Sequence, residues 1–321
     1  MAHNIDNMAY VGEVPWHGLG VKVNSVMTAE EAIKAGRLDW RVNKKDVFLQ
    51  DGQKIEGKFA TVREDNIPLG IVGPNYTVLN NSDAFSFMDA LITEKTAVYH
   101  TVGSLGKGER VWVLAKLPES VEVTHKDVVD QFLLLSNSHD GSSSVTVRFT
   151  PIRVVCQNTL MAAFNHSSYV VNIRHTTNMG DKVEEARRIM GISSKFYSQF
   201  SELAKAMTHV KSSAEIVEEM LKSIGYGKQQ IEERDSTRSE NIRSDILKFV
   251  KSGKGSNLEG TEGTLWGMLN GIVEYVDYGR KSREIGNGAE SNRLETIWFG
   301  AGADLKKKAW DCATELVKVR A

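Results

Sequence analysis

The spacing of hydrophobic residues changes once along this chain, near residue 175, and this change constrains the fold more than any other feature. From Trp40 to about His175 the apolar residues come in short β-branched and aromatic runs, such as RVWVLAKLP and SSVTVRFT, which predict strands. From Val183 to Met207 they recur every three or four positions, which predicts helices. Strands followed by helices are the pattern of an α+β protein.

We therefore expect an antiparallel β-meander sheet with interspersed helices, followed by a helical C-terminal region. The expected boundaries place an N-terminal arm with a short helix at residues 1–37, an α+β sheet domain at residues 38–178 and the helical region at residues 179–321. With 321 residues the chain is long enough for one large domain or two ordinary ones.

Local signals place the turns and helices. The run TAEE from Thr28 forms a capping box that predicts a short helix, and Asp51-Gly52 predicts a hairpin turn in the meander. Two helices are expected within the sheet domain, one beginning at Asn81 and one over residues 151–164. The Gly- and Ser-rich stretch at residues 252–263 is expected to be a mobile loop.

The charge balance excludes a protein that is basic over its whole surface. The chain has 40 Lys plus Arg and 41 Asp plus Glu, a net charge of -1, so any contact with nucleic acid must come from a local patch. No stretch approaches the ~18 apolar residues of a membrane span, and the first residues lack a signal-peptide pattern. We therefore expect a cytoplasmic protein with no membrane partner.

One stretch concentrates groups that bind phosphate. Between Gln131 and Gly180, three arginines stand against Asp140 alone. Guanidinium groups, small hydroxyls and the exposed backbone N–H groups of a Gly/Ser turn all hold phosphate oxygens, and a histidine in the turn would contribute when protonated. The predicted nucleic-acid-binding residues are Arg148, Arg153, Arg174, His139, Ser142 and Ser143.

The same stretch also has a purely structural interpretation, and the sequence leaves both open. Asp140-Gly141 would make a hairpin turn between two apolar strands, the serines would be solvated, and the arginines would pair with acids across the sheet. The two interpretations make opposite forecasts for Arg153→Ala, which would lower either the affinity for nucleic acid or the melting temperature.

The sequence offers no recognisable enzyme, because it contains no HExxH, GxxxxGK[ST], paired Asp-x-Asp or nucleophile-elbow motif. Cys156 has two possible roles: a reactive thiol beside His139 or His175, or an inert residue of the core. Its apolar neighbours Val154-Val155 favour the core. Cys156 and Cys312 lack the neighbours of a disulfide framework or a zinc site. We expect no catalytic residue, no cofactor and no metal.

The N-terminal segment PWHGLG contains Trp16, an aromatic residue that precedes the first expected helix. Trp16 would dock either on the core of its own chain or on a neighbouring subunit, and both alternatives stay open. We expect a homo-oligomer, a ring or a filament, with Trp16 or the C-terminal helices at the interface. A chain of balanced charge can assemble in this way without strong self-repulsion.

Several motifs resemble those of one known family: PWHGLG, SHDGSSSV, TPIRVVCQNTL, IRHT, LWGMLNGIVEYVDYGR and TIWFGAGADLKKKAW. They are similar to the phage/plasmid-like protein family, which occurs in phages, prophages and conjugative plasmids and whose domain is of unknown function. The resemblance runs from Met1 nearly to the C-terminus. It implies a mobile-element protein that acts in the cytoplasm of a bacterial host, and it brings no established activity or catalytic residue.

The order of elements in the meander is also similar to that of single-strand annealing proteins of the eukaryotic recombination-mediator type. Together with the phosphate-binding interpretation and the mobile-element family, this similarity implies a non-catalytic protein that binds and anneals single-stranded DNA. The alternative is a protein-binding module that counteracts a host defence system by contact with a host protein.

Overall fold

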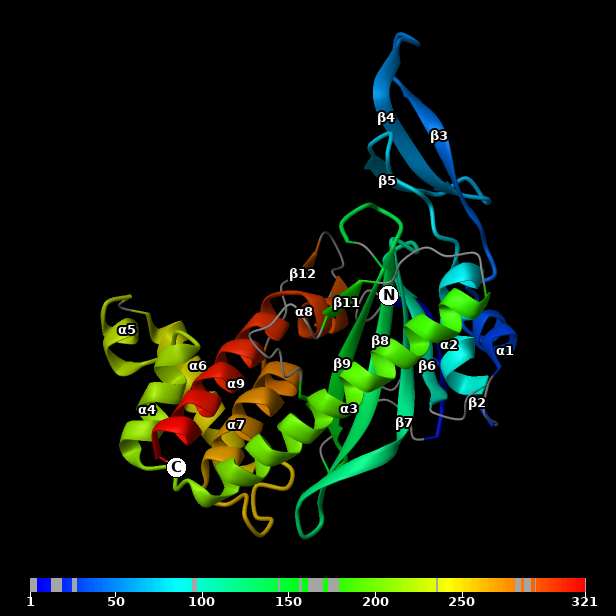
Figure 1. The fold of residues 1–321 in the computed structure, drawn as a ribbon. Helices are drawn as coiled ribbons and strands as arrows, with labels where there is room; N and C mark the ends of the chain where they lie inside the picture. The colour runs from blue at the N-terminus through cyan, green and yellow to red at the C-terminus, as the bar shows by residue number, and fades with distance from the viewer. Residues whose placement is uncertain are drawn as a thin grey trace. The chain divides into compact units, whose positions relative to one another are not determined.

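The computed structural model of the chain has the expected α+β fold, in which strands dominate before Met179 and helices after it (Figure 1). In the described ranges, no helix combines the length and the apolar surface needed to cross a membrane. The structure describes residues 5–12, 19–24, 28–93, 97–143, 145–155, 158–160, 170–172, 179–234, 236–280, 284–285, 290–291 and 293–320.

The strands of the described residues form three sheets. They are β1 (Ile5–Val11), β2 (Val21–Val23), β3 (Val42–Phe48), β4 (Lys54–Arg63), β5 (Pro68–Val72), β6 (Val98–Leu105), β7 (Arg110–Thr124), β8 (Asp127–Ser138), β9 (Thr146–Arg153), β10 (Asn158–Thr159), β11 (Val170–Asn172), β12 (Glu284–Ile285) and β13 (Glu290–Ser291). The large sheet has the order β10-β9-β8-β7-β6-β1-β2, with β11 beside β9. Strands β3-β4-β5 form a separate antiparallel sheet, and β12-β13 form a small one.

Helices cover most of the chain after Met179. The helices are α1 (Ala29–Ala35), α2 (Asn81–Thr93), α3 (Met179–His209), α4 (Ala214–Ser223), α5 (Lys228–Glu232), α6 (Thr237–Ser252), α7 (Leu265–Glu274), the π-helical turn η3 (Tyr275–Gly279), α8 (Arg293–Phe299) and α9 (Ala301–Arg320). The predicted capping box is confirmed, since the Thr28 hydroxyl accepts from the Glu31 N–H and the Glu31 carboxylate accepts from the Thr28 N–H. The helix expected to begin at Asn81 is also confirmed, as α2.

The helix predicted over residues 151–164 is wrong for the residues that the structure describes. Pro151 and Arg153 continue strand β9, and β10 follows at Asn158–Thr159. The carbonyl of Pro151 accepts from the Leu160 N–H at 2.8 Å, which joins the two strands. The β-branched residues Val147, Thr150 and Ile152 favour this extended backbone, and their preference outweighs the helix-start signal of the proline.

Contacts divide the chain into two compact units. In the first, the Trp112 and Tyr99 side chains are fully buried. In the second, α7 is buried along its whole length, and the Phe200 and Trp310 rings stack with centroids 5.2 Å apart. The first unit comprises Met1–Pro118, Phe132–Arg148 and Val170–Gly191, and the second comprises Glu119–Gln131, Phe149–Tyr169 and Ile192–Ala321.

Within the first unit, strand β5 packs closely on the turn between β8 and β9. A Cβ atom added to Gly70 would lie 2.6 Å from the Asp140 Cα, and one added to Gly141 would lie 2.9 Å from a Val72 methyl group. Gly141 also has a φ of +79°, a conformation that other residues rarely adopt. The two glycines therefore allow the β3-β4-β5 sheet to approach the turn and hold its backbone in place.

The close approach at Gly70 predicts a difference between two glycine-to-alanine variants. Gly70→Ala should destabilise the protein by about 1–3 kcal/mol, because the new methyl group meets backbone atoms that cannot move aside. Gly73→Ala is the matched control, since nothing lies within 4 Å of its added Cβ. Urea denaturation of both variants checks this, and equal stability of the two would show that the approach at Gly70 is not tight.

Candidate nucleic-acid interface

The turn between β8 and β9 is built around the carboxylate of Asp140. Oδ1 of Asp140 accepts a hydrogen bond from the Ser142 N–H at 2.9 Å and another from the Ser138 hydroxyl. The Ser143 N–H donates to the Ser138 Oγ at 3.3 Å. Asp followed by Gly is a sequence that favours such a side-chain-stabilised turn. The turn leaves the side chain of Ser142 exposed and that of Ser143 half-buried.

Two arginines lie on the strands near this turn, and one of them contacts it. Arg110, at the start of β7, donates from Nη2 to the Ser142 Oγ at 3.2 Å. Arg148 lies on β9, and both arginines are half-buried. Burial, and then the positive charge of Arg110, lower the pKa of Arg148. Two guanidinium groups that feel one another's charge are stabilised by an anion between them, and the planar guanidinium binds phosphate well.

Asp140 supplies an internal negative charge at this place. Burial raises the pKa of Asp140, but hydrogen bonds from Ser138 and Ser142 and the positive charge of Arg110 outweigh burial, so the net shift is downward. Asp140 is therefore ionised at neutral pH. The turn therefore holds the Arg110 guanidinium beside one carboxylate, and Arg148 lies on β9 within reach of the charge of Arg110. Arg148 is a predicted residue and Arg110 is not.

His139 lies in the interior and does not act as a cation at neutral pH. Its side chain is 0% exposed, its Nε2 lies 2.9 Å from the Asn81 Oδ1, and the edge of its ring meets Trp40 with centroids 5.3 Å apart. Burial lowers the pKa of His139 to about 4. The expected phosphate contact by a protonated His139 is thus corrected to a neutral histidine that joins Trp40 and Asn81 to the end of β8.

Arg153 also lies in the interior, within the second unit. It is 1% exposed, and its Nε and Nη2 donate to the two carboxylate oxygens of Asp127 at 2.6 and 2.7 Å. The indole Nε1 of Trp266 donates to the same carboxylate at 2.8 Å. A guanidinium enclosed in this way presents no surface to a phosphate. For Arg153 the structure therefore supports the internal ion pair.

Arg153 also binds the stretch at residues 252–263, which the sequence predicts to be a mobile loop. Its Nη1 and Nη2 donate to the carbonyls of Lys254 and Gly255, and its Nη2 donates to the Thr261 hydroxyl. The Thr124 hydroxyl donates to the carbonyl of Glu259 at 2.7 Å. The loop is therefore held at several points, by the buried Arg153 and by Thr124.

The remaining predicted residues fall into two groups. Ser142 and Ser143 lie in the turn, but their backbone N–H groups already donate to Asp140 and Ser138, so the expected backbone cradle is occupied from within the chain. Trp16, Arg174 and Cys156 lie outside the residues that the structure describes.

Two further polar residues have no clear signal in the sequence. Arg110 comes 32 positions before Ser142, and only the β7–β8–β9 order brings them together. Lys306 stands in a run of three lysines, yet it is buried and donates to Asp277 at 2.8 Å and to Thr159 Oγ1 at 2.7 Å. Burial lowers the pKa of Lys306, against the attraction of Asp277. This second buried ion pair ties α9 to η3 and β10.

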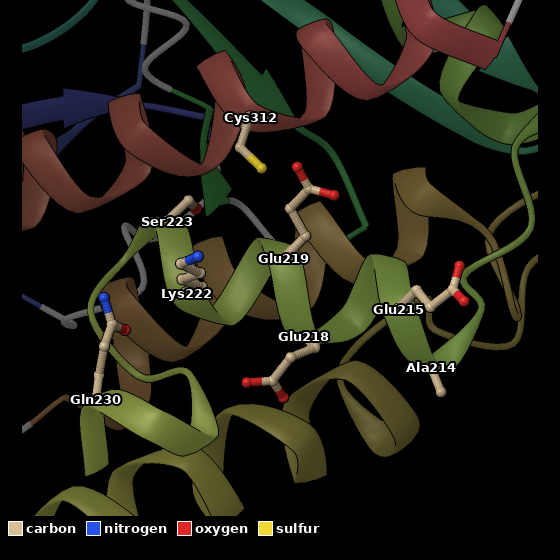
Figure 2. Close-up of a pocket in the computed structure, with 8 residues that line it drawn as sticks. All are labelled: Ala214, Glu215, Glu218, Glu219, Lys222, Ser223, Gln230 and Cys312. Atoms are coloured by element: carbon tan, nitrogen blue, oxygen red, sulfur yellow. The ribbon is translucent and has the colours of Figure 1, made fainter. Parts of the chain in front are cut away.

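A groove of about 790 Å³ lies in the second unit, between α4 and α9 (Figure 2). Cys312 and Glu219 extend toward one another in it. Burial and the charge of Glu219 raise the pKa of Cys312 against a hydrogen bond with Ser223, so the thiol stays protonated and is a weak nucleophile. The lining residues are Ala214, Glu215, Glu218, Glu219, Lys222, Ser223, Gln230 and Cys312.

Comparison with known proteins gives one match. A family model described as Domain of unknown function (DUF932) matches residues 68–298. No curated protein and no solved structure matches the chain.

Among the residues that the structure describes, no group of three or more His, Cys, Asp or Glu side chains could hold a metal ion.

The position of Arg153 predicts a loss of stability on substitution. Arg153→Ala should lower the free energy of unfolding by about 3–5 kcal/mol, because the Asp127 carboxylate would remain buried without its partner. Arg238→Ala, at an exposed position of α6, should change it by less than about 0.5 kcal/mol. Chemical denaturation measures both, and a small effect at Arg153 would contradict the ion pair.

The burial of His139 predicts a loss of stability in acid. Its pKa of about 4 in the folded protein lies below the ordinary histidine value of 6.5, so its contribution is complete above pH 6.5 and disappears as the pH falls toward 4. The loss amounts to about 3 kcal/mol. His139→Gln should reduce this pH dependence, whereas His125→Gln, at an exposed position, should keep it. Identical pH profiles for the two variants would refute the assignment.

Proposed function

This chain belongs to the family described as Domain of unknown function (DUF932), and we propose that it is a non-catalytic protein that binds single-stranded nucleic acid at the β8–β9 turn. The observation that carries the proposal is the placement of Arg110 and Arg148 on two strands, close enough for the charge of Arg110 to act on Arg148, with Arg110 bonded to the exposed Ser142. Guanidinium groups held on strands lose less conformational freedom on binding than lysines on a loop.

The geometry favours contact with the nucleic-acid backbone over contact with the bases. Three aromatic side chains of this unit, Trp40, Tyr99 and Trp112, are at most 7% exposed, so they offer no face for stacking. The half-buried Phe59 ring is covered by the Lys44 ammonium. Phosphate contacts carry no sequence information. The proposed protein therefore binds without strong sequence preference, and its affinity depends steeply on salt.

Annealing and oligomer formation extend this proposal. One turn with two arginines contacts few phosphates, and a chain of net charge -1 adds no general attraction to DNA. Several subunits along one strand would multiply the weak contact through their high local concentration. A ring or filament of identical subunits is the assembly that such multiplication requires, and it stays a prediction.

Substitution of the two arginines tests the proposal. Arg110→Ala and Arg148→Ala should each weaken binding of fluorescent single-stranded DNA about 10- to 100-fold at low salt, as expected when a charge-assisted hydrogen bond of about 1.5–3 kcal/mol is removed. Each should also reduce the salt slope by about 0.7 for every phosphate that the variant no longer neutralises. Arg238→Ala, which removes the same charge from an exposed site of the second unit, is the control.

Two results would contradict the proposal. The first is an absence of DNA binding by the wild-type protein at low salt, which would favour the alternative of a protein-binding module. The groove in Figure 2 suits that alternative, because its three glutamates, Glu215, Glu218 and Glu219, would attract a basic segment of a partner. The second is equal weakening by all three arginine variants, which would show that only net charge matters.

A further inference from the structure

We infer that Asp140 is an internal competitor for the phosphate that binds the β8–β9 turn, so that its carboxylate occupies the site until a ligand displaces it. The inference rests on the proposed function, because it concerns the same turn. It assigns to Asp140 the control of how tightly, and for which ligands, the turn binds.

Asp140 uses the hydrogen-bond donors that a phosphate would need. Its Oδ1 accepts from the Ser142 N–H at 2.9 Å and from the Ser138 hydroxyl. The Ser138 and Ser142 hydroxyls lie 3.0 Å apart, and Arg110 reaches the latter at 3.2 Å. One N–H cannot bond strongly to a carboxylate and a phosphate together. A phosphate oxygen at this place therefore takes the position of the Asp140 carboxylate.

The charge of Asp140 also stands in for that of a ligand. Without an anion, the guanidinium groups of Arg110 and Arg148 would repel one another, in keeping with the lowered pKa of Arg148. The carboxylate of Asp140 attracts Arg110 in the free protein, and this attraction offsets part of the repulsion. A ligand must bring at least one negative charge to replace that compensation, so the turn excludes neutral ligands and binds anions less tightly than an arginine pair without the aspartate.

The backbone of the turn is fixed, so only the Asp140 side chain has to move when a phosphate replaces its carboxylate. The approach of Gly70 to the Asp140 backbone and of Gly141 to Val72 holds the turn against β5. The exchange of carboxylate for phosphate therefore takes place by rotation of the Asp140 side chain, while the turn and the β3-β4-β5 sheet keep their arrangement. Rotation of one side chain is a small change, which fits a site that binds and releases a strand repeatedly.

The decisive variant is Asp140→Asn, because asparagine keeps the oxygen that accepts from the Ser142 N–H and removes only the charge. Its affinity for fluorescent single-stranded DNA at low salt should rise about tenfold over the wild-type value. Adding Arg110→Ala, which removes the guanidinium beside Asp140, should abolish the increase. Asp39→Asn, at an exposed position of the same unit, changes the net charge equally and should leave affinity within about twofold.

The outcomes separate this inference from the proposed function. DNA binding that depends on Arg148 but does not increase in folded Asp140→Asn overturns the inference alone. An absence of binding by both the wild-type protein and Asp140→Asn overturns both proposals. Asp140→Ser is the second variant, since its hydroxyl also accepts from the turn, and circular dichroism checks folding. If neither variant folds, Asp140 is purely structural and the inference is wrong.

Discussion

The hydrogen bonds of the Asp140 carboxylate are the interaction on which the candidate site depends. They close the β8–β9 turn through Ser138 and Ser142, and they place a negative charge beside Arg110. The same turn packs against β5, because Gly70 has no side chain and the Asp140 backbone lies directly against it. The carboxylate thus sets the balance of charge at the turn, while the close approach of Gly70 and Gly141 holds the turn backbone and the three-stranded sheet together.

Burial separates the structural cations of this protein from those that can meet a ligand. Arg153 and Lys306 are enclosed and paired with Asp127 and Asp277, where removal of either partner would leave a buried charge. Arg110 and Arg148 remain half-buried on β7 and β9, and Arg110 contacts the turn through Ser142. They are fixed enough to bind at little entropic cost and open enough to reach a phosphate. Their position, and not the total charge of the chain, is the physical basis of the proposed function.

The fold class and many local elements follow from the sequence, since hydrophobic spacing and the capping box at Thr28 depend on nearby residues. The helix predicted over residues 151–164 fails because the strand preference of its β-branched residues and pairing with β10 outweigh a local proline signal. The site is harder to predict. Arg148 and Ser142 lie close in sequence, but Arg110 joins them only through strand order, and the burial of Arg153 depends on Asp127 and on a loop about a hundred residues away. Local sequence patterns predict neither the Arg110–Ser142 contact nor the Arg153–Asp127 ion pair.

The most direct measurement of binding at the β8–β9 turn is the ¹H–¹⁵N spectrum of the arginine Nε–Hε groups during titration with single-stranded DNA. We predict that the resonances of Arg110 and Arg148 shift, together with the backbone amide of Ser142, while the resonance of Arg153 stays in place because its guanidinium is bound to Asp127. A spectrum in which Arg153 shifts and Arg110 and Arg148 do not, or in which no arginine shifts at saturating DNA, would contradict binding at this turn.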